Sequence, residues 1–110
     1  MRTVNGPIAI VTLLAVFTLW PSQATGASAA DLYKTKCVMC HGADGSGKTP
    51  MGKRLGLRDL RSEEIQKQPD SELMEAIQNG KGKMPAQKGR LGKDEIRQLV
   101  GFVRELAKKR

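Results

Sequence analysis

The chain of 110 residues carries the run Cys37-Val38-Met39-Cys40-His41, which holds both of its cysteines and its only histidine. A Cys-x-x-Cys-His sequence is typical of the covalent attachment of a c-type haem. Two thiols at this spacing can add to the two vinyl groups of one porphyrin, and the next residue is then held against the iron. We therefore expect Cys37 and Cys40 to form thioether bonds and His41 to ligate the iron.

Other roles for the cysteine pair fit the residues less well. A structural zinc ion takes four ligands, and beyond Cys37, Cys40 and His41 the chain has no Cys or His to complete the set. A thioredoxin-like dithiol lies at a strand-to-helix turn, and no strand pattern surrounds this pair. Haem attachment is thus favoured over a zinc site, a redox dithiol or a chance match.

The first thirty residues differ in character from the rest. Arg2 is followed by an uncharged, mostly apolar run from Ile8 to Trp20, which Pro21 ends. A basic residue, an apolar core and then small residues are typical of a secretory signal peptide. The apolar run is shorter than the about 20 residues of a transmembrane helix, so an uncleaved membrane anchor is the weaker alternative.

Small residues allow cleavage after Ala24 or after Ala29. Ser28 stands three residues before Asp31 at the head of a helical pattern, where its hydroxyl can cap the helix. Cleavage after Ala29 would remove that cap. We therefore expect residues 1–24 to be a signal peptide and residues 25–110 to be the mature domain.

The mature part is predicted to be one small all-α domain with about four short helices. The predicted helices span residues 29–40, 63–67, 72–79 and 93–108. Ser62 is the expected cap of the second helix, and Asp70 or Ser71 that of the third. The segments 42–50 and 81–91 are predicted to be loops. A domain this small has little core of its own, so a covalently held porphyrin would supply the missing apolar body.

Methionine is the candidate for the second axial ligand, because a soft thioether stabilises reduced iron and the chain has no second histidine. Met39 lies between the two cysteines, and Met74 lies on an apolar helix stripe where methionine usually fills the core. Met84 lies in a loop that the following proline stiffens, between the last two predicted helices. Position favours Met84, with Met51 as the alternative.

Together these features resemble the class I c-type cytochromes, the small monohaem electron carriers. The resemblance covers nearly all of residues 25–110. It rests on Tyr33 four residues before the first cysteine, the run Cys37-x-x-Cys40-His41-Gly42, the loop Gly82-Lys83-Met84-Pro85, and the final helix with Ile96, Leu99, Val100, Gly101, Phe102 and Val103.

The resemblance implies a cytochrome c fold around one covalently attached haem c, with His41 and Met84 as the axial ligands of the iron. It also implies that the first and last helices cross, which would bring Ala29 and Tyr33 against Leu99 and Phe102. A backbone carbonyl, here expected near Pro50, would accept a hydrogen bond from the other ring nitrogen of His41. The expected cap of the last helix, Gly92, departs from the Ser or Thr of many relatives.

The implied function is that of an exported, monomeric one-electron carrier between larger redox proteins, not of an enzyme. In bacteria such proteins receive their haem on the periplasmic side. One rival is a haem enzyme or small-ligand sensor of the peroxidase type, which needs an open sixth position on the iron. The other is a haem subunit fixed in a dehydrogenase or oxidase complex.

The charge of the chain is strongly basic, with 19 Lys and Arg against 11 Asp and Glu. This favours steering towards redox partners with acidic docking surfaces over a merely solubilising role, with contact to an anionic membrane surface as a secondary expectation. Nucleic acid is a poor fit, because few aromatics accompany the charges and the export signal points elsewhere. The basic residues expected to flank the haem are Lys34, Lys36, Lys48, Lys53, Arg54, Lys81, Lys83, Lys88 and Arg90.

Overall fold

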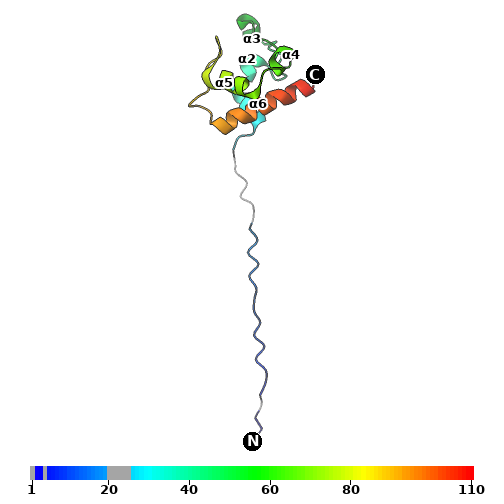
Figure 1. Ribbon diagram of the computed structural model, residues 1–110. Helices are drawn as coiled ribbons and strands as arrows, with labels where there is room; N and C mark the ends of the chain where they lie inside the picture. Colours follow the sequence, from blue (N-terminus) through cyan, green and yellow to red (C-terminus); the bar gives the residue numbers. More distant parts are fainter. Residues whose placement is uncertain (1, 4, 20–25) are drawn as a thin grey trace.

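Helices form the folded part of this computed structural model, which describes residues 2, 3, 5–19 and 26–110 (Figure 1). Their bounds are α1 Ala29–Lys36, α2 Val38–His41, α3 Pro50–Leu55, α4 Glu63–Gln66, α5 Asp70–Asn79 and α6 Lys93–Lys108. The described residues contain no β-strand, only isolated bridges in the loop between α5 and α6. The all-α prediction is confirmed, although the part of the chain that the structure describes forms six helices where about four were expected.

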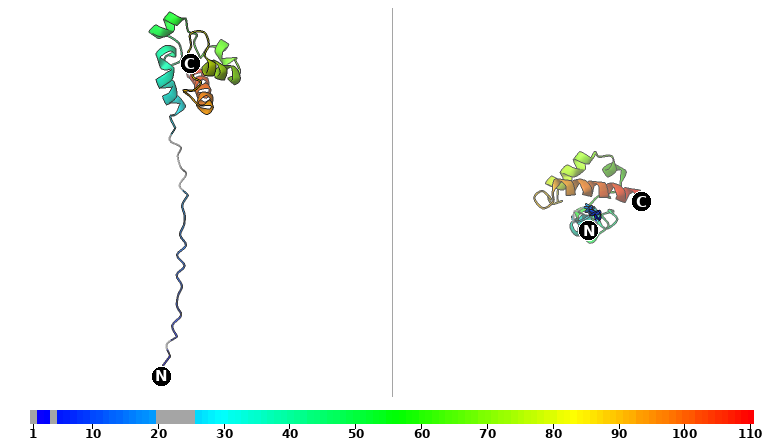
Figure 2. Two further views of the ribbon diagram at one scale, coloured as in Figure 1. Left: turned by 90° about the vertical axis from the view of Figure 1, so that its left-hand side faces the viewer. Right: turned by 90° about the horizontal axis from the view of Figure 1, so that it is seen from below.

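The apolar segment near the N-terminus projects away from the helices (Figures 1 and 2). Ile8 and Phe17 in this segment are 90% and 91% exposed, so the segment adds nothing to the core. Among the described residues, no helix combines the length and the apolar character that crossing a membrane requires. The expected cleavage position after Ala24 lies outside the described residues.

The core forms where α1 crosses α6 (Figure 2). Its buried members are Leu32, Tyr33, Leu91, Ile96, Leu99 and Leu106. The rings of Tyr33 and Phe102 lie with their centroids 4.8 Å apart and tilted by 38°, a favourable arrangement for two aromatic side chains. The predicted helix crossing is therefore confirmed, while Ala29 is only half-buried and lies outside this cluster.

Helix α6 forms because its apolar residues recur on one face. Five of them, Ile96, Leu99, Val100, Val103 and Leu106, are buried. At its start, the Gly92 N–H donates a 2.9 Å hydrogen bond to Glu95 Oε1. Gly92 has no side chain that could accept a hydrogen bond from the Glu95 N–H, so only half of a capping box is present. The negative charges of Asp94 and Glu95 in the first turn interact favourably with the helix dipole.

The helix expected over 29–40 is divided at Cys37. This residue has φ −119° and ψ −33°, so the chain turns between α1 and the short α2. Ser28 caps α1 as predicted, its Oγ accepting a 3.1 Å hydrogen bond from the Asp31 N–H. The division places the second cysteine and His41 on a separate turn of helix.

Helix α3 was not predicted, and its sequence does carry the signals of a helix start and stop. Thr49 is the N-cap, Pro50 is the first helical residue, and Gly56 ends the helix with a left-handed φ of 65°. Met51, the alternative axial ligand, therefore lies on a helix and not in a loop.

Helix α5 begins at Asp70 after Pro69, so the expected cap at Asp70 or Ser71 is wrong. The Asp70 carboxylate instead accepts hydrogen bonds of 3.1 and 2.8 Å from Nε and Nη2 of Arg104 on α6. Arg104 also donates to the carbonyls of Gln66 and Gln68 at 2.9 and 2.6 Å. One half-buried guanidinium thus ties the α4–α5 connection to α6.

Candidate haem site

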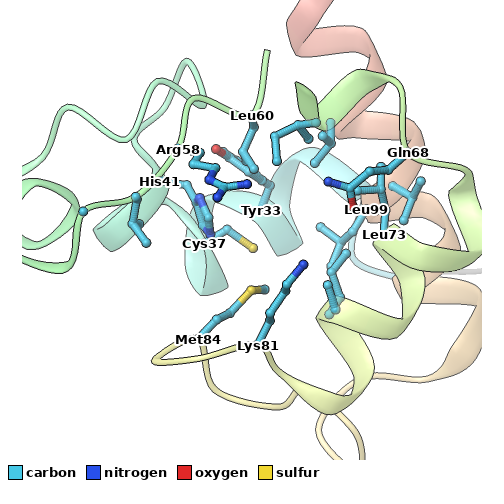
Figure 3. A pocket seen from close by; sticks show the side chains of 17 residues that line it. Tyr33, Cys37, His41, Arg58, Leu60, Gln68, Leu73, Lys81, Met84 and Leu99 are labelled. Carbon is cyan, nitrogen blue, oxygen red and sulfur yellow. The ribbon is translucent and has the colours of Figure 1, made fainter. Parts of the chain in front are cut away.

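An apolar cavity of about 310 Å³ lies between α1, α5, α6, residues 56–60 and the loop after α5 (Figure 3). Leu57, Leu73, Ile77 and Leu99 supply much of its wall. The volume is at the lower end of the roughly 300–1,000 Å³ range of ligand and cofactor pockets. A cavity with such walls suits a flat, largely apolar group.

Three of the four predicted site residues reach this cavity. Cys37, His41 and Met84 line it, and Figure 3 shows the Cys37 and Met84 sulfur atoms entering the hollow from different segments. Cys40 is half-buried on α2 and does not line the wall. Neither does Met51, so of the two candidate axial methionines only Met84 lines the wall.

The turn that carries Met84 closes on itself. The Lys81 N–H donates to the Met84 carbonyl at 3.2 Å, and the Met84 N–H donates to the Lys81 carbonyl at 3.0 Å. Gly82 takes a left-handed φ of 59° within this turn, as glycine readily does. Gly80 leaves room for the backbone behind it, since a Cβ there would lie 2.5 Å from the Met84 carbonyl oxygen.

The far end of the same loop is tied back to α5. The Gln87 N–H donates to the Ile77 carbonyl at 2.9 Å, and the Lys88 N–H donates to the Gln78 carbonyl at 3.0 Å. These bonds use carbonyls that the last turn of a helix leaves free. The loop with Met84 is therefore anchored by its own hydrogen bonds on both sides.

His41 ends α2 with its imidazole largely buried. Its Nδ1 atom is buried and has no hydrogen-bond partner among the described residues, so the expected acceptor near Pro50 is not in place. Burial lowers the pKa of His41, which favours the neutral imidazole that binds metals. A buried nitrogen without a protein partner is uncommon and fits a side chain destined for a bound group.

Both cysteines of the attachment run are half-buried. Both thiols are free, and burial, with a smaller effect of the neighbouring Cys40, raises the pKa of Cys37 to about 11. Metal sites and redox dithiols use thiolates with lowered pKa values. In the part of the chain that the structure describes, no group of three or more His, Cys, Asp and Glu side chains converges as a metal site.

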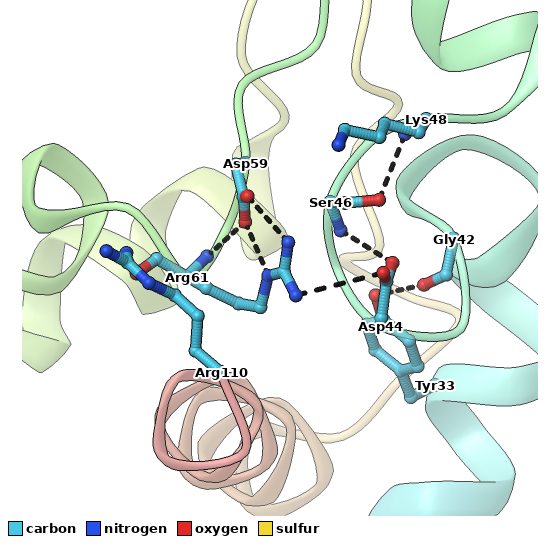
Figure 4. A network of polar contacts seen from close by, with 8 residues as sticks. All are labelled: Tyr33, Gly42, Asp44, Ser46, Lys48, Asp59, Arg61 and Arg110. Carbon is cyan, nitrogen blue, oxygen red and sulfur yellow. Dashed lines mark hydrogen bonds and ion pairs between the residues drawn. The ribbon is translucent and has the colours of Figure 1, made fainter.

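The loop that follows His41 is held by a polar network (Figure 4). Tyr33 Oη donates a 2.7 Å hydrogen bond to the Gly42 carbonyl, and Asp44 Oδ1 accepts one of 3.0 Å from the Ser46 N–H. Arg61 pairs with Asp59 at 2.9 Å and lies 3.8 Å from Asp44. The bond from Ser46 holds the pKa of Asp44 below its ordinary value, and the bond from Arg61 does so for Asp59.

Several cavity residues escaped prediction from the sequence. Arg58, Leu57 and Gln68 line the wall from irregular segments, where no periodic pattern marks a buried side chain. Lys81, by contrast, is one of the basic residues expected to flank the haem, and its side chain extends beside Met84 into the hollow (Figure 3). Outside the cavity wall, the Thr49-Pro50 pair is a sequence signal for the start of α3, because proline is favoured at the first position of a helix.

An all-α fold around an apolar cavity, with Cys-x-x-Cys-His on one side and a loop methionine on another, defines the class of small c-type cytochromes. Comparison with known proteins agrees. The model of the family described as "Cytochrome C oxidase, cbb3-type, subunit III" matches residues 24–103. The chain belongs to this cytochrome c family.

Individual relatives support the same assignment. Cytochrome c6 of Leptolyngbya boryana is 33% identical over 86 residues, which cover 78% of this chain and 98% of that protein. Cytochrome c6 of Bryopsis maxima is 35% identical over 79 residues, which cover 67% of this chain and 83% of that protein. The solved KustC0563 c-type cytochrome is 34% identical with a TM-score of 0.68, covering 73% of this chain and 98% of its own. The protein is a monohaem c-type electron carrier with covalently attached haem c.

Proposed function

We propose that Cys37 and Cys40 hold the haem and that His41 and Met84 are its axial ligands. The observation that carries this is convergence: Cys37 and His41 of the attachment run and Met84, from a loop much later in the sequence, line one apolar cavity. Tyr33 and the aliphatic side chains around them, several of them on α6, make the wall largely apolar. Bound haem supplies a one-electron couple between Fe(III) and Fe(II).

The proposed site is closed and serves electron transfer, without substrate chemistry. Met84 is held in a hydrogen-bonded turn beside the cavity, which opposes loss of the sixth ligand. The chain has one histidine, and that residue is the proposed proximal ligand, so no second imidazole is available for acid–base work. Two relatives, both named cytochrome c6, support a carrier rather than an enzyme.

Carbon monoxide binding to the reduced protein tests the closed site. We expect the reduced wild-type protein to bind carbon monoxide slowly or not at all at neutral pH, and Met84→Ala to bind it rapidly, because the substitution opens the sixth position. Rapid binding by the wild-type protein would overturn the carrier proposal in favour of a ligand-binding haem protein.

A second candidate function follows from the description of the matching family, which names a subunit of an oxidase. In that case the domain would pass electrons within a fixed complex. The match to 98% of a cytochrome c6 instead supports a carrier that works alone and as a monomer. Isolation of the native protein without other subunits, and its elution at the size of one chain, would support the free carrier, and constant co-purification with an oxidase would support the subunit.

The proposed partners are larger redox proteins with acidic docking surfaces. Arg58 and Lys81 lie at the cavity and Lys83 is exposed next to Met84, while none of the described residues that line the cavity is acidic. A positive field around the electron-transfer site speeds encounter with a negative surface and weakens with salt. A peripheral contact with an anionic membrane is a secondary proposal on the same charges.

We propose further that residues 1–24 are a signal peptide and that residues 25–110 form the mature domain, exported to the periplasm or its equivalent. The exposed apolar segment before the domain and the Ser28 cap on α1 support cleavage after Ala24. Such cleavage leaves 18 basic and 11 acidic residues, a net charge of +7. Mass spectrometry of the mature protein tests this, and an N-terminus at Ala30 or an intact Met1 would contradict it.

A further inference from the structure

Both peptide planes that flank His41 are pinned by hydrogen bonds. The Cys40 carbonyl, which belongs to the peptide before His41, accepts a 2.7 Å bond from Thr49 Oγ1. The His41 carbonyl, which belongs to the peptide after it, accepts a 2.7 Å bond from the Gly47 N–H. Because a peptide unit is rigid, two fixed planes determine the backbone angles at His41 and hence the direction of its Cα–Cβ bond.

Thr49 serves two elements with one hydroxyl. While Oγ1 donates to the Cys40 carbonyl, it also accepts a 2.8 Å hydrogen bond from the Gly52 N–H, as the N-cap of α3. The end of α2 and the start of α3 are therefore joined through a single oxygen atom. Loss of that hydroxyl would release a carbonyl beside His41 and the first turn of α3 together.

The backbone packing at this junction leaves little freedom. A Cβ at Gly52 would lie 2.6 Å from the Cys40 carbonyl oxygen and 2.1 Å from the Gly47 carbonyl oxygen. Helix α3 thus lies with bare backbone against the carbonyls of Cys40 and Gly47, the first of which belongs to the peptide before His41. The His41 ring has no such restraint of its own, because its Nδ1 is buried without a partner among the described residues.

We propose that Thr49 is a positioning residue, which sets the orientation of His41 towards the haem iron by pinning the Cys40–His41 peptide. The proposal rests on the proposed role of His41 as axial ligand. A histidine ligand is usually oriented by a bond to its second ring nitrogen. In this structure the bonds from Thr49 and Gly47 hold the peptides on either side of His41.

The test compares Thr49→Val, which removes the hydroxyl at nearly constant shape, with Thr49→Ser, which keeps it. Thr35→Val is the matched control, because the Thr35 hydroxyl bonds only to carbonyls of α1, those of Asp31 and Leu32. The ferric haem proteins are examined by electron paramagnetic resonance and by the paramagnetically shifted haem methyl signals, which report the orientation of the axial imidazole. Amide exchange at Gly52 is measured alongside.

We expect Thr49→Val to add a second low-spin ferric species or a changed order of haem methyl shifts, and to speed exchange at Gly52 about tenfold. Thr49→Ser should match the wild type in both measurements, and so should Thr35→Val. If Thr49→Val does not accumulate with haem, Thr49→Ala removes the same hydroxyl without adding a methyl group.

Faster exchange at Gly52 with unchanged haem spectra would overturn the proposal, since Thr49 would then be only a helix cap. Spectral change of equal size in Thr35→Val would overturn it as well. Failure of the proposed function has a different signature: the wild-type ferric spectrum would then lack histidine–methionine low-spin character, whatever the Thr49 variants do.

Discussion

Tyr33 contributes to the fold with both ends of its side chain. The ring packs against Phe102, and the hydroxyl donates a 2.7 Å bond to the Gly42 carbonyl, one residue after the proposed axial histidine. The residue is 3% exposed, so the hydroxyl has no ready access to solvent. A single side chain thereby joins the α1–α6 crossing to the loop beside the haem site.

Tyr33→Phe should destabilise the protein without changing its core packing. The variant keeps the ring and leaves the Gly42 carbonyl without its buried donor, at a cost of about 1–2 kcal/mol. Urea unfolding should show a lower midpoint with an unchanged m-value. An unchanged midpoint would mean that water satisfies this carbonyl and that the hydroxyl adds nothing to stability.

The same residue predicts how stability depends on pH. Burial, with smaller effects of Cys37 and Asp44, raises the pKa of Tyr33 above its ordinary value of 10.0. The unfolded chain then loses the phenol proton first, so this contribution to stability is complete below about pH 10 and is lost as the pH rises through the folded pKa. The free energy of unfolding of the wild type should approach that of Tyr33→Phe above about pH 10. Urea unfolding between pH 9 and pH 11 checks this, and a constant difference in the free energy of unfolding between the two proteins would contradict the prediction. The protein has one tyrosine, so no second phenol complicates the comparison.

At the scale of elements, α3 shows how a short helix acts on a site that it does not line. Its first turn lies on the backbone of the haem-attachment run, and the contact requires a glycine at position 52. The cavity wall itself comes from the other five helices and irregular segments. The role of α3 is to support the turn that carries His41.

Gly52→Ala should therefore damage the site, although alanine is the better helix former. The added methyl group overlaps two carbonyl oxygens, so α3 must move away at a cost of about 1–3 kcal/mol. Gly101→Ala is the matched control, because Gly101 lies on the exposed face of α6 and a Cβ there meets nothing within 4 Å. This substitution should stabilise by about 0.5–1 kcal/mol. Thermal unfolding of the two variants with haem bound checks this: the Tm should fall in Gly52→Ala and rise in Gly101→Ala. Shifts of the Tm in the same direction would contradict the prediction.

The sequence predicted elements whose signals are local and missed those that tertiary contacts determine. Apolar spacing located α6, and Ser62 marked the start of α4. The cap at Asp70 was wrong because Arg104, far along the chain, engages its carboxylate. The turn at Cys37 had no sequence signal, since its φ of −119° is open to any residue.

At the scale of the whole molecule, some cavity residues could be predicted from local sequence and others could not. Cys37 and His41 follow from a five-residue run, and Met84 from its proline-stiffened loop together with the family resemblance. Leu57, Arg58 and Gln68 could not be predicted, because they reach the cavity from segments without periodicity. The convergence of these parts is a property of the assembled fold.

The distribution of charge predicts the speed of reaction with anions. Lys83 is exposed beside Met84, whereas Lys109 is the C-cap of α6. Lys83→Glu should slow oxidation of the reduced protein by ferricyanide about threefold at low ionic strength, and Lys109→Glu should slow it less. Stopped-flow rates should converge in 1 M salt, where the Debye length is about 3 Å. Equal slowing by both substitutions would indicate an effect of net charge alone.

The central claim is that His41 and Met84 occupy the two axial positions of the haem iron. The visible spectrum of the ferric protein tests this claim most directly. The measurement is the weak far-red band of a sulfur–iron bond, in the wild type, in Met84→Ala and in Met51→Ala, whose methionine lies on α3 away from the cavity wall. The account predicts that the band is present in the wild type, lost in Met84→Ala and retained in Met51→Ala. A band that survives Met84→Ala, or that disappears with Met51→Ala, would contradict it.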